Sequence, residues 1–254
     1  FPTILQGYVQ SSSIKNTQNK LRNHLCTAEA LVSVSEPVFP LRHGGRLVFP
    51  VGEFTAALST PELRYGFERG YIKEIRRLAW YEKAPIFSAF VGEIYKLRRQ
   101  FADAGNETFS YLAKILLNSL YGKFGQNGIK WDTVGVWPDV GDPPLYIRET
   151  PDAPIVRRRV RLGTLQELSR DGESQNSFPA ISAHVTAHAR MVLWRLIQQA
   201  GRENVFYCDT DSLVTNAEGY ARLKDKIAAA TLGGLKVEAT ASSATFWGAK
   251  DYRF

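Results

Sequence analysis

Two carboxylates set one residue apart, Asp209 and Asp211 in the stretch FYCDTDSLVTN, are the part of this sequence with the clearest chemical potential. Apolar residues on either side predict two short strands with the acids at or near the turn between them. Residues i and i+2 of an extended chain project to one face, so each carboxylate would raise the pKa of the other unless a cation neutralised them. Mg²⁺ binds oxygen ligands and typically takes one or two carboxylates together with substrate phosphates.

A solvated polar turn is the common alternative explanation for such a pair of acids. The flanking apolar runs, VFYC and LV, predict instead that the hairpin is buried in a core, where carboxylates without a partner are costly. A site for a divalent metal ion is therefore the favoured interpretation.

A second polar pattern lies in KILLNSLYGKFG, residues 114–125. At 100° per residue, Lys114, Asn118 and Tyr121 fall within about 60° of one another on a helix. A cation, an amide and a phenol on one face suit a ligand with phosphate, sugar and base, and lysine supplies a point charge for phosphate. An amphipathic helix with a polar outer face explains the same pattern, and the residues alone leave both interpretations open.

The segments around these motifs predict an α+β chain, in which a small sheet is flanked by helices and a long helical hairpin projects from it. Residues 1–58 are expected to form strands and irregular structure. Thr60 as N-cap, Pro61 at the first helical position and Gly70 beyond the end predict one helix. A strand is favoured for the segment that follows, YIKEIRRLAWYEKA.

Two amphipathic helices are predicted next. Apolar residues from Phe87 onward recur at helical spacing and predict the first helix, which stops near Gly105. The second is expected to start after Asn106 and to pack antiparallel to the first. Its expected buried stripe comprises Phe109, Leu112, Ala113, Leu116 and Leu120.

The C-terminal half begins with loop-rich residues 126–178, in which the basic run RRRVR is expected to lie between short strands. The segment FPAISAHVTAHARMVLWRLIQQAG predicts a strong helix from near Pro179 to Gly201. The hairpin of Asp209 follows, then a shorter helix near 217–230. Strands are expected in LKVEATAS and ATFWGAKDYRF.

The order of these motifs resembles that of a known family. KILLNSLYG followed by YCDTDS resembles motifs B and C of the family B DNA polymerases, most closely those of the protein-primed branch of bacteriophages, linear plasmids and mobile elements. FPTIL resembles the second half of motif A, IFSAFVGEIYKLRR the first fingers helix, TAHAR the TAxAR segment and KDY the KxY motif. The resemblance runs from end to end and implies a polymerase palm, an antiparallel sheet with flanking helices, plus a helical-hairpin fingers subdomain.

By this resemblance, Asp209 and Asp211 would be the catalytic carboxylates and metal ligands. Two Mg²⁺ ions, for which Mn²⁺ could substitute, would activate the primer 3′-hydroxyl and stabilise the leaving pyrophosphate. The family's third carboxylate, the motif A Asp, would lie upstream of Phe1. We therefore expect the chain to be a piece of a longer protein and to be inactive alone.

The resemblance also implies a nucleotide site. The side chains expected to bind the incoming dNTP are Lys114, Asn118, Tyr121, Arg98 and Phe1. Lys114 would hold the triphosphate with the help of Arg98, for which Arg99 is a rival. The amide and the phenol would line the nascent base pair and sugar. Phe1 stands where the family has a Tyr and would keep the steric wall against a ribose 2′-hydroxyl.

The implied partners are primer-template DNA and dNTPs, with a terminal protein primer as a further candidate. The expected DNA contacts are Lys250, Tyr252, Gly122 and Arg158. For Arg158, which lies in the run RRRVR, a solvated basic strand face is the alternative interpretation. Residues 1–58 would be the N-terminal part of the palm with a connecting insertion, and residues 59–125 the fingers with motif B. Residues 126–178 would be an insertion between motifs B and C, and residues 179–254 the palm with motif C and KxY.

Composition limits the alternatives. The 254 residues, 44% of them hydrophobic, can bury a core in one large domain or two unequal lobes. A net charge of +7 favours a polyanionic partner, although the charge alone is equally explained by a basic soluble protein without one. Two cysteines, with Cys208 expected to be buried, argue against a disulfide framework. No apolar run approaches the roughly 20 residues of a membrane span. An intracellular protein, in the host cytoplasm or an organelle matrix, is expected.

Three hypotheses follow from the sequence. The first is a template-directed DNA polymerase. The second is a truncated or degenerate polymerase that binds primer-template DNA without catalysis. The third, a glycosyltransferase with a DxD metal site, has no role for the helix KILLNSLYG. His184 and His188 have a spacing able to bind zinc, but without a third ligand they are interpreted as core or surface histidines.

Overall fold

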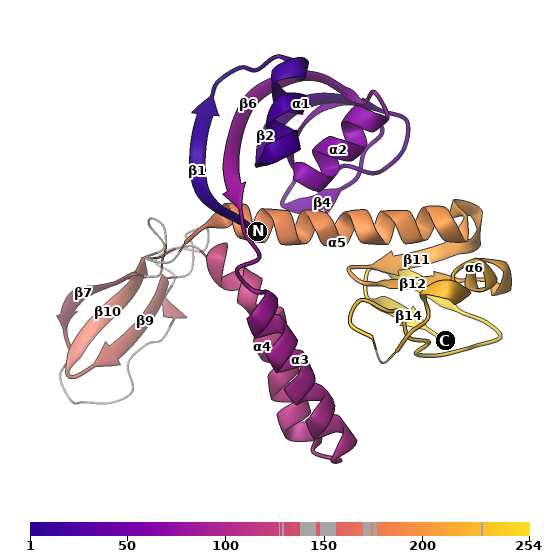
Figure 1. The fold of residues 1–254 in the computed structure, drawn as a ribbon. Coiled ribbons are helices and arrows are strands. Elements are labelled where there is room, and N and C mark those ends of the chain that lie inside the picture. The colour runs from indigo at the N-terminus through magenta and orange to yellow at the C-terminus, as the bar shows by residue number, and fades with distance from the viewer. Residues whose placement is uncertain are drawn as a thin grey trace. The chain divides into compact units, whose positions relative to one another are not determined.

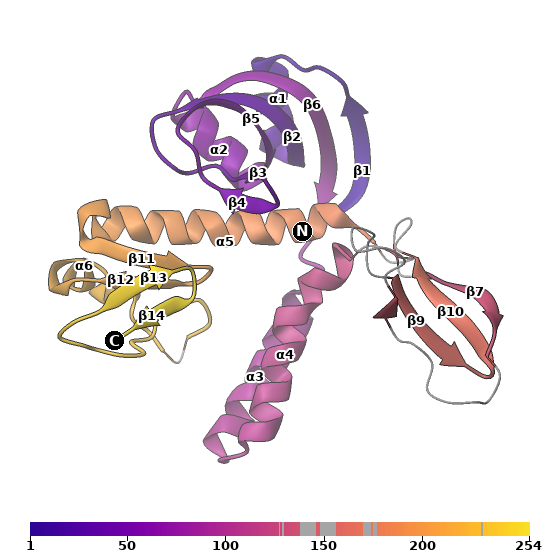
Figure 2. The ribbon, with the colours of Figure 1, turned by 180° about the vertical axis from the view of Figure 1, so that it is seen from behind.

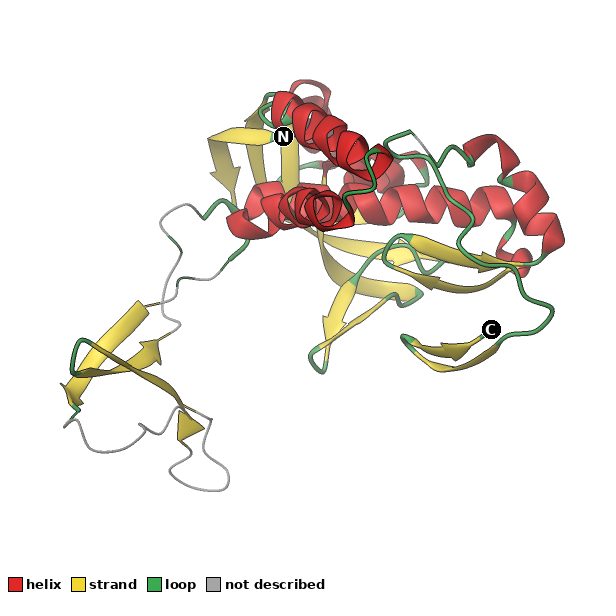
Figure 3. Cartoon of the chain, turned by 90° about the horizontal axis from the view of Figure 1, so that it is seen from below, coloured by secondary structure: helices red, strands yellow, loops and turns green. Residues whose placement is uncertain are grey.

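The computed structural model is shown in Figures 1 and 2. The residues it describes are 1–126, 128, 130–137, 146–147, 156–169, 174, 177–229 and 231–254. The chain divides into two compact units: Phe1–Asn118 together with Ala183–Phe254, and Ser119–Ser182. The strands form separate antiparallel groups, which Figure 3 distinguishes from the helices by colour.

A four-stranded antiparallel sheet of order β1-β6-β2-β5 forms the core of the first unit. Its strands are β1 (Pro2–Val9), β2 (Leu25–Val34), β5 (Gly52–Ser59) and β6 (Ile72–Lys83). Alternate residues of β2 are buried: Cys26, Ala28, Ala30, Val32 and Val34. This period of two places one face of the sheet against the core, as predicted for strands covered on one side. The strand prediction for β6 is confirmed.

Helices α1 (Ile14–Asn23), α2 (Thr60–Glu68) and α5 (Pro179–Ala200) contribute to that core. Leu21, Leu63 and Trp194, one from each helix, lie in the same buried cluster as the inward residues of β2. The prediction for residues 1–58 missed α1, because only Thr17 and Leu21 of its ten residues are buried and the apolar pattern is weak. A short hairpin of β3 (Leu41–His43) and β4 (Arg46–Val48) completes this segment.

Helix α2 is confirmed, but its N-cap is Ser59 rather than Thr60. The Thr60 hydroxyl is already used: it accepts from the backbone N–H of Cys26 at 2.6 Å, donates to the Cys26 carbonyl at 3.2 Å, and lies 3.2 Å from Nε2 of the buried His184. The side chain of Glu62 instead reaches back to the Ser59 N–H at 3.0 Å, which closes a capping box. His184 is thus a core histidine, and His188 is exposed.

Helix α5, confirmed from Pro179 to Ala200, is held by polar contacts along its length. The buried Glu62 carboxylate accepts two hydrogen bonds from the Arg190 guanidinium, at 3.0 and 2.8 Å. About one and two turns further on, Trp194 and Gln198 donate hydrogen bonds to the Tyr65 hydroxyl, both at 3.0 Å. The segment TAHAR therefore supplies an arginine that ties α5 to α2.

Helices α3 (Ser88–Asp103) and α4 (Glu107–Phe124) form the predicted antiparallel pair and lie side by side in Figures 1 and 2. Gly105, at φ +71°, ends the first helix, and the rings of Phe101 and Phe109 lie 5.3 Å apart. The predicted buried stripe of α4 is wrong in most of its members. Of that stripe Ala113 is buried, whereas Phe109, Leu112 and Leu116 are about half exposed, because α3 covers only a narrow part of α4.

The second unit contains a four-stranded antiparallel sheet of order β7-β10-β9-β8. Its strands are β7 (Lys130–Val136), β8 (Tyr146–Ile147), β9 (Val156–Arg161) and β10 (Thr164–Ser169). The basic run RRRVR is itself strand β9 rather than a linker between strands. Arg158 bonds to Glu167 of β10 at 2.6 Å, and Arg159 lies 4.1 Å above the ring of Trp131.

Two hairpins and a short helix end the first unit. They are β11 (Val205–Asp209), β12 (Ser212–Thr215), α6 (Ala217–Arg222), β13 (Thr245–Gly248) and β14 (Asp251–Arg253). Short 3₁₀ turns occupy Arg202–Asn204 and Lys224–Lys226. The predicted helix near 217–230 is shorter than expected. The strand expected in LKVEATAS is also wrong, since that segment forms only a bridge between Ile227 and Leu235. Among the described residues, no helix is both long and apolar enough to cross a membrane.

Removal of the Arg190 guanidinium would leave Glu62 buried without its counter-charge. We expect Arg190→Met to lower the free energy of unfolding by about 3 kcal/mol near pH 8, measured by urea denaturation. Arg195→Met is the matched control, because Arg195 is exposed on the same helix. We expect that control to change stability by less than about 0.5 kcal/mol.

The loss of unfolding free energy in Arg190→Met should become smaller on acidification. Burial raises the pKa of the Glu62 carboxyl, and Arg190 opposes that rise. Without the arginine, the pKa of the Glu62 carboxyl in the folded state rises further. The stability lost in Arg190→Met is therefore absent below the unfolded-state pKa of about 4.3, where the carboxyl is neutral in both states, and it grows as pH increases above that value. Equal penalties near pH 4 and pH 8 would contradict this assignment.

Candidate active site at the acidic hairpin

The two acids lie at the end of the antiparallel hairpin β11–β12. Asp209 pairs with Ser212, which leaves Thr210 and Asp211 as a two-residue loop. Such loops favour turns with a positive φ at the first central residue, and Thr210 has a φ of +49°. The Asp209 carbonyl accepts from the Asp211 N–H at 2.5 Å and from the Ser212 hydroxyl at 3.0 Å. The predicted hairpin is confirmed, and the backbone of its turn is well bonded.

Both oxygens of the Asp209 carboxylate carry a hydrogen bond. Lys250 donates from Nζ to Oδ2 at 2.6 Å, and Thr210 donates from its hydroxyl to Oδ1 at 2.9 Å. These bonds, that of Lys250 first, hold the pKa of the Asp209 carboxyl below its usual range, and the same ion pair raises the pKa of Lys250. Asp211 is exposed. A lysine therefore neutralises one member of the acid pair.

Lys250 is brought to this position by the β13–β14 hairpin. The ring of Tyr207 stacks on Phe246 at 5.1 Å and lies 5.3 Å from Tyr252. The Tyr207 hydroxyl also accepts a hydrogen bond from the backbone N–H of Lys250 at 2.8 Å. The sequence singled out Lys250 and Tyr252 for primer contacts, but it carried no signal for the ion pair with Asp209, because 41 residues separate the partners.

The prediction that this hairpin is buried in a core is wrong. Phe206 is 62% exposed, and Cys208, expected to be buried, is exposed as well. In a two-stranded ribbon alternate side chains face opposite sides, so Tyr207 meets the aromatic residues of β13–β14 while Phe206 and Cys208 face away. Burial is therefore no argument for a metal here; the argument that remains is the pairing of the acids themselves.

The predicted nucleotide-binding residues lie on the helical pair and at the start of β1. Lys114 and Asn118 are exposed on α4, and Arg98 is half-buried on α3, where its rival Arg99 pairs with Asp103 at 3.4 Å. Among the described residues, no ion pair joins Lys114 to either acid of the hairpin.

Tyr121 and Gly122 also lie on α4, in the part of that helix assigned to the second unit, and both are exposed. Phe1 lies at the other end of the predicted set. Its ring meets that of Phe87 edge-on at 4.8 Å, and its carbonyl accepts from the Ala84 N–H at 3.0 Å. The ring is thus held where β1 and β6 lead into α3.

The donor set of the hairpin suits a hard divalent cation. Asp209 and Asp211 offer carboxylate oxygens, the ligand type that such a cation prefers. In the part of the chain that the structure describes, no group of three or more His, Cys, Asp or Glu side chains is assembled. These two acids therefore fit a cation that takes its remaining ligands from water or substrate phosphate.

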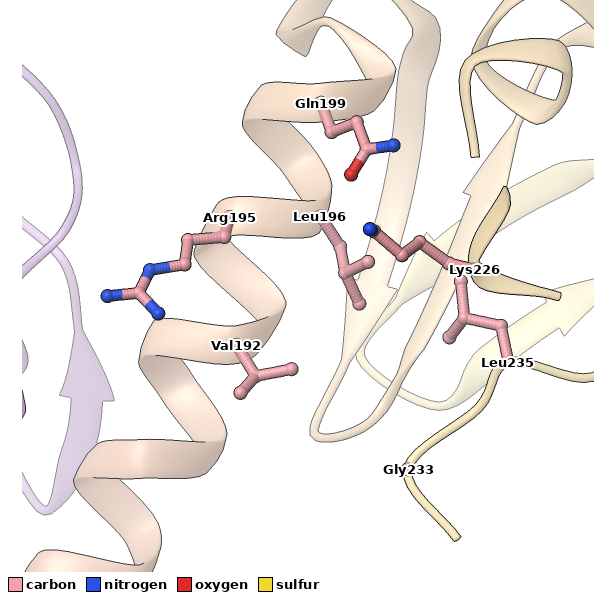
Figure 4. Close-up of a pocket in the computed structure, with 7 residues that line it drawn as sticks. All are labelled: Val192, Arg195, Leu196, Gln199, Lys226, Gly233 and Leu235. Carbon is pink, nitrogen blue, oxygen red and sulfur yellow. The ribbon is translucent and has the colours of Figure 1, made fainter. Parts of the chain in front are cut away.

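A shallow pocket of about 230 Å³ lies elsewhere, between α5 and the segment after α6 (Figure 4). Its lining residues are Val192, Arg195, Leu196, Gln199, Lys226, Gly233 and Leu235. Figure 4 shows Arg195 pointing away from the segment that carries Lys226, so the two cations do not converge on a common anion. None of the predicted site residues lines this pocket.

Comparison with known proteins identifies a family whose sequence pattern this chain matches. Residues 5–137, just over half of the chain, match the family described as DNA polymerase type B, organellar and viral. The chain is 31% identical over 198 residues to the DNA-directed DNA polymerase of Enterobacteria phage PRD1. The aligned region covers 76% of this chain and 34% of that protein. It is 28% identical over 242 residues to a probable DNA polymerase of Podospora anserina, covering 83% of this chain and 19% of that protein.

The fold is similar to that of a solved polymerase. Phi29 DNA polymerase complexed with primer-template DNA and incoming nucleotides superposes with a TM-score of 0.57 at 18% identity, over 92% of this chain and 38% of that one. The α+β architecture predicted from the sequence is confirmed by this likeness. The chain spans about a fifth to a third of the length of these relatives.

Tyr207 should anchor the lysine-bearing hairpin through both its ring and its hydroxyl. We expect Tyr207→Phe to remove one hydrogen bond, worth about 1 kcal/mol, and to speed amide exchange at Lys250 about fivefold. Tyr207→Ala also removes the aromatic stack, worth about 1 kcal/mol more, and should speed exchange further. Hydrogen exchange measured by NMR checks both, with Tyr220→Phe as control. Equal exchange in the two Tyr207 variants would show that the stack does not anchor Lys250.

Proposed function

The chain belongs to the organellar and viral type B DNA polymerases, and on that basis we propose that it carries part of a site for template-directed transfer of a deoxynucleotide to a primer 3′-hydroxyl. One observation carries the proposal: the hairpin β11–β12 presents Asp209 and Asp211 together, with the Lys250 ammonium 2.6 Å from the first acid. The two carboxylates can act as ligands for a metal ion, and the lysine ammonium can pair with a phosphate.

The metal expected at the acids is Mg²⁺, as two ions, with Mn²⁺ as a possible substitute. A divalent cation held by Asp209 and Asp211 would lower the pKa of a hydroxyl it contacts and offset charge on a departing phosphate. The chain's own contribution is to hold the two carboxylates at one turn, where the bonds to the Asp209 carbonyl restrain the backbone.

Side chains away from the acids would bind the substrates, which we expect to be dNTPs and primer-template DNA. Those for the nucleotide are Lys114, Asn118, Tyr121, Arg98 and Phe1; those for DNA are Lys250, Tyr252, Gly122 and Arg158. The exposure of Lys114 and of Phe1, which is 37% exposed, supports these roles. The same proposal includes a terminal protein as a primer. It also includes an intracellular site of action, because the DNA substrate lies inside the cell.

Loss of Asp211 should abolish catalysis while leaving the fold intact, because its side chain is exposed. We expect Asp211→Ala to slow primer extension with Mg²⁺ by at least about a hundredfold, since a bound metal contributes several kcal/mol to the transition state. Extension is measured with this chain alone and with the complete product of its gene. Asp225→Ala, an exposed acid outside the hairpin, is the control. Extension by the complete product that survives Asp211→Ala would exclude the catalytic role.

DNA binding without catalysis is the second candidate. It is favoured by the absence, among the described residues, of a third carboxylate grouped with the two acids. A pure binder would hold primer-template DNA equally well after Asp211→Ala and would extend no primer in either form of the protein. A polymerase would extend primers when the complete gene product is supplied.

Strand β9 offers a graded test of DNA contact. Arg161 is exposed, whereas Arg158 is half-buried and bonded to Glu167. We expect Arg161→Gln to reduce the slope of log Kd against log salt by about one, because one phosphate contact is lost. Arg158, proposed above as a DNA contact, also bonds to Glu167, so Arg158→Gln should loosen the β9–β10 pair as well as weaken DNA binding. A salt slope reduced only by Arg158→Gln would show that Arg158, and not Arg161, contacts the phosphate.

A further inference from the structure

Lys250 occupies an unusual place for a residue assigned to nucleic acid. Its ammonium lies 2.6 Å from Oδ2 of Asp209, the same carboxylate that the proposed function assigns to a divalent cation. Two cations cannot share that oxygen without repulsion. The ion pair and the metal site are therefore alternatives at Asp209.

We propose that Lys250 is an exchangeable counter-ion: it neutralises Asp209 in the metal-free chain, leaves when a divalent cation binds, and is then free to pair with a phosphate. This inference rests on the proposed function, since it takes Asp209 and Asp211 as the ligands. It adds a competition between lysine and metal that the ligand assignment alone does not contain.

The backbone of Lys250 is held by neighbouring residues, whereas its side chain is largely exposed and is bonded to Asp209 through the ammonium. The N–H bonds to the Tyr207 hydroxyl at 2.8 Å, and the next residue, Asp251, pairs with Gly248 across the β13–β14 hairpin. The side chain is 75% exposed, whereas that of Asp209 is 29% exposed. A flexible four-carbon stem can therefore swing the ammonium into solvent without undocking the hairpin.

The two acids are unequal before metal arrives. Asp209 is bonded by Lys250 and Thr210, while Asp211 is exposed at the adjacent loop position. A divalent cation attracted by Asp211 meets the ammonium at Asp209 and displaces it, because the double charge binds a carboxylate pair more strongly than a single charge does. After its release the ammonium stays within one side-chain length of the metal, because the backbone of Lys250 is held. There it can pair with a phosphate of a bound nucleic acid.

Linkage gives the exchange a second consequence. If a phosphate captures the ammonium after the metal has displaced it, nucleic acid must strengthen metal binding as much as metal strengthens nucleic-acid binding. A lysine that only oriented the Asp209 carboxylate would predict the opposite sign for its own removal, namely weaker metal binding. The sign of that change separates the two roles.

The test is titration of the chain with Mn²⁺ alone, with free ion measured by electron paramagnetic resonance. We expect Lys250→Met to bind Mn²⁺ roughly tenfold more tightly than the unaltered chain, because one repelling charge is gone. Lys250→Arg keeps that charge and should bind like the unaltered chain. Lys236→Met, which removes an exposed lysine paired with Glu238, is the matched control and should change nothing.

A second arm adds primer-template DNA. It should tighten Mn²⁺ binding in the unaltered chain at least threefold and leave Lys250→Met unchanged. Equal or weaker Mn²⁺ binding by Lys250→Met would overturn the exchange while leaving the metal site in place, provided that Asp209→Asn with Asp211→Asn abolishes binding. If that double substitution has no effect on Mn²⁺, both the metal site and the exchange are wrong.

Discussion

The rest of the first unit depends on the burial of one carboxylate. Glu62 caps α2 through the Ser59 N–H and is removed from water, a position that a charged group can hold only with a counter-charge and hydrogen bonds. Arg190 provides both, and in doing so it sets α5 against α2. Because α5 leads through Gly201 into β11, the same contact orients the chain that carries Asp209.

A second carboxylate is neutralised by different means. Asp209 is only partly covered, and its partner is an exposed lysine rather than the half-buried guanidinium that serves Glu62. Arginine suits the fixed pair because its planar fork makes two bonds to one carboxylate, whereas lysine suits an exchangeable pair because its charge is a point on a flexible stem. The two pairs therefore serve distinct purposes: one stabilises the packing, and the other keeps an acid available to a ligand.

Local patterns predicted most elements correctly. Helices α2, α3, α4 and α5, strand β6 and the acidic hairpin were all expected, because capping residues, glycines at positive φ and apolar periods act within a few residues of one another. The errors share a cause. Helix α1 has only Thr17 and Leu21 buried, and the apolar stripe of α4 is exposed, because burial depends on which neighbours exist and periodicity does not report that.

The sequence by itself determined that two acids lie together at a turn, that a helix carrying Lys114 precedes them, and that the order of motifs resembles that of a polymerase. Those features depend on spacing along the chain. Only the tertiary structure decided that Lys250 neutralises Asp209, that Arg190 serves Glu62, and that β11–β12 is half-exposed. Each of these joins segments 41 residues or more apart or depends on packing, and electrostatic pairing acts through space rather than along the sequence.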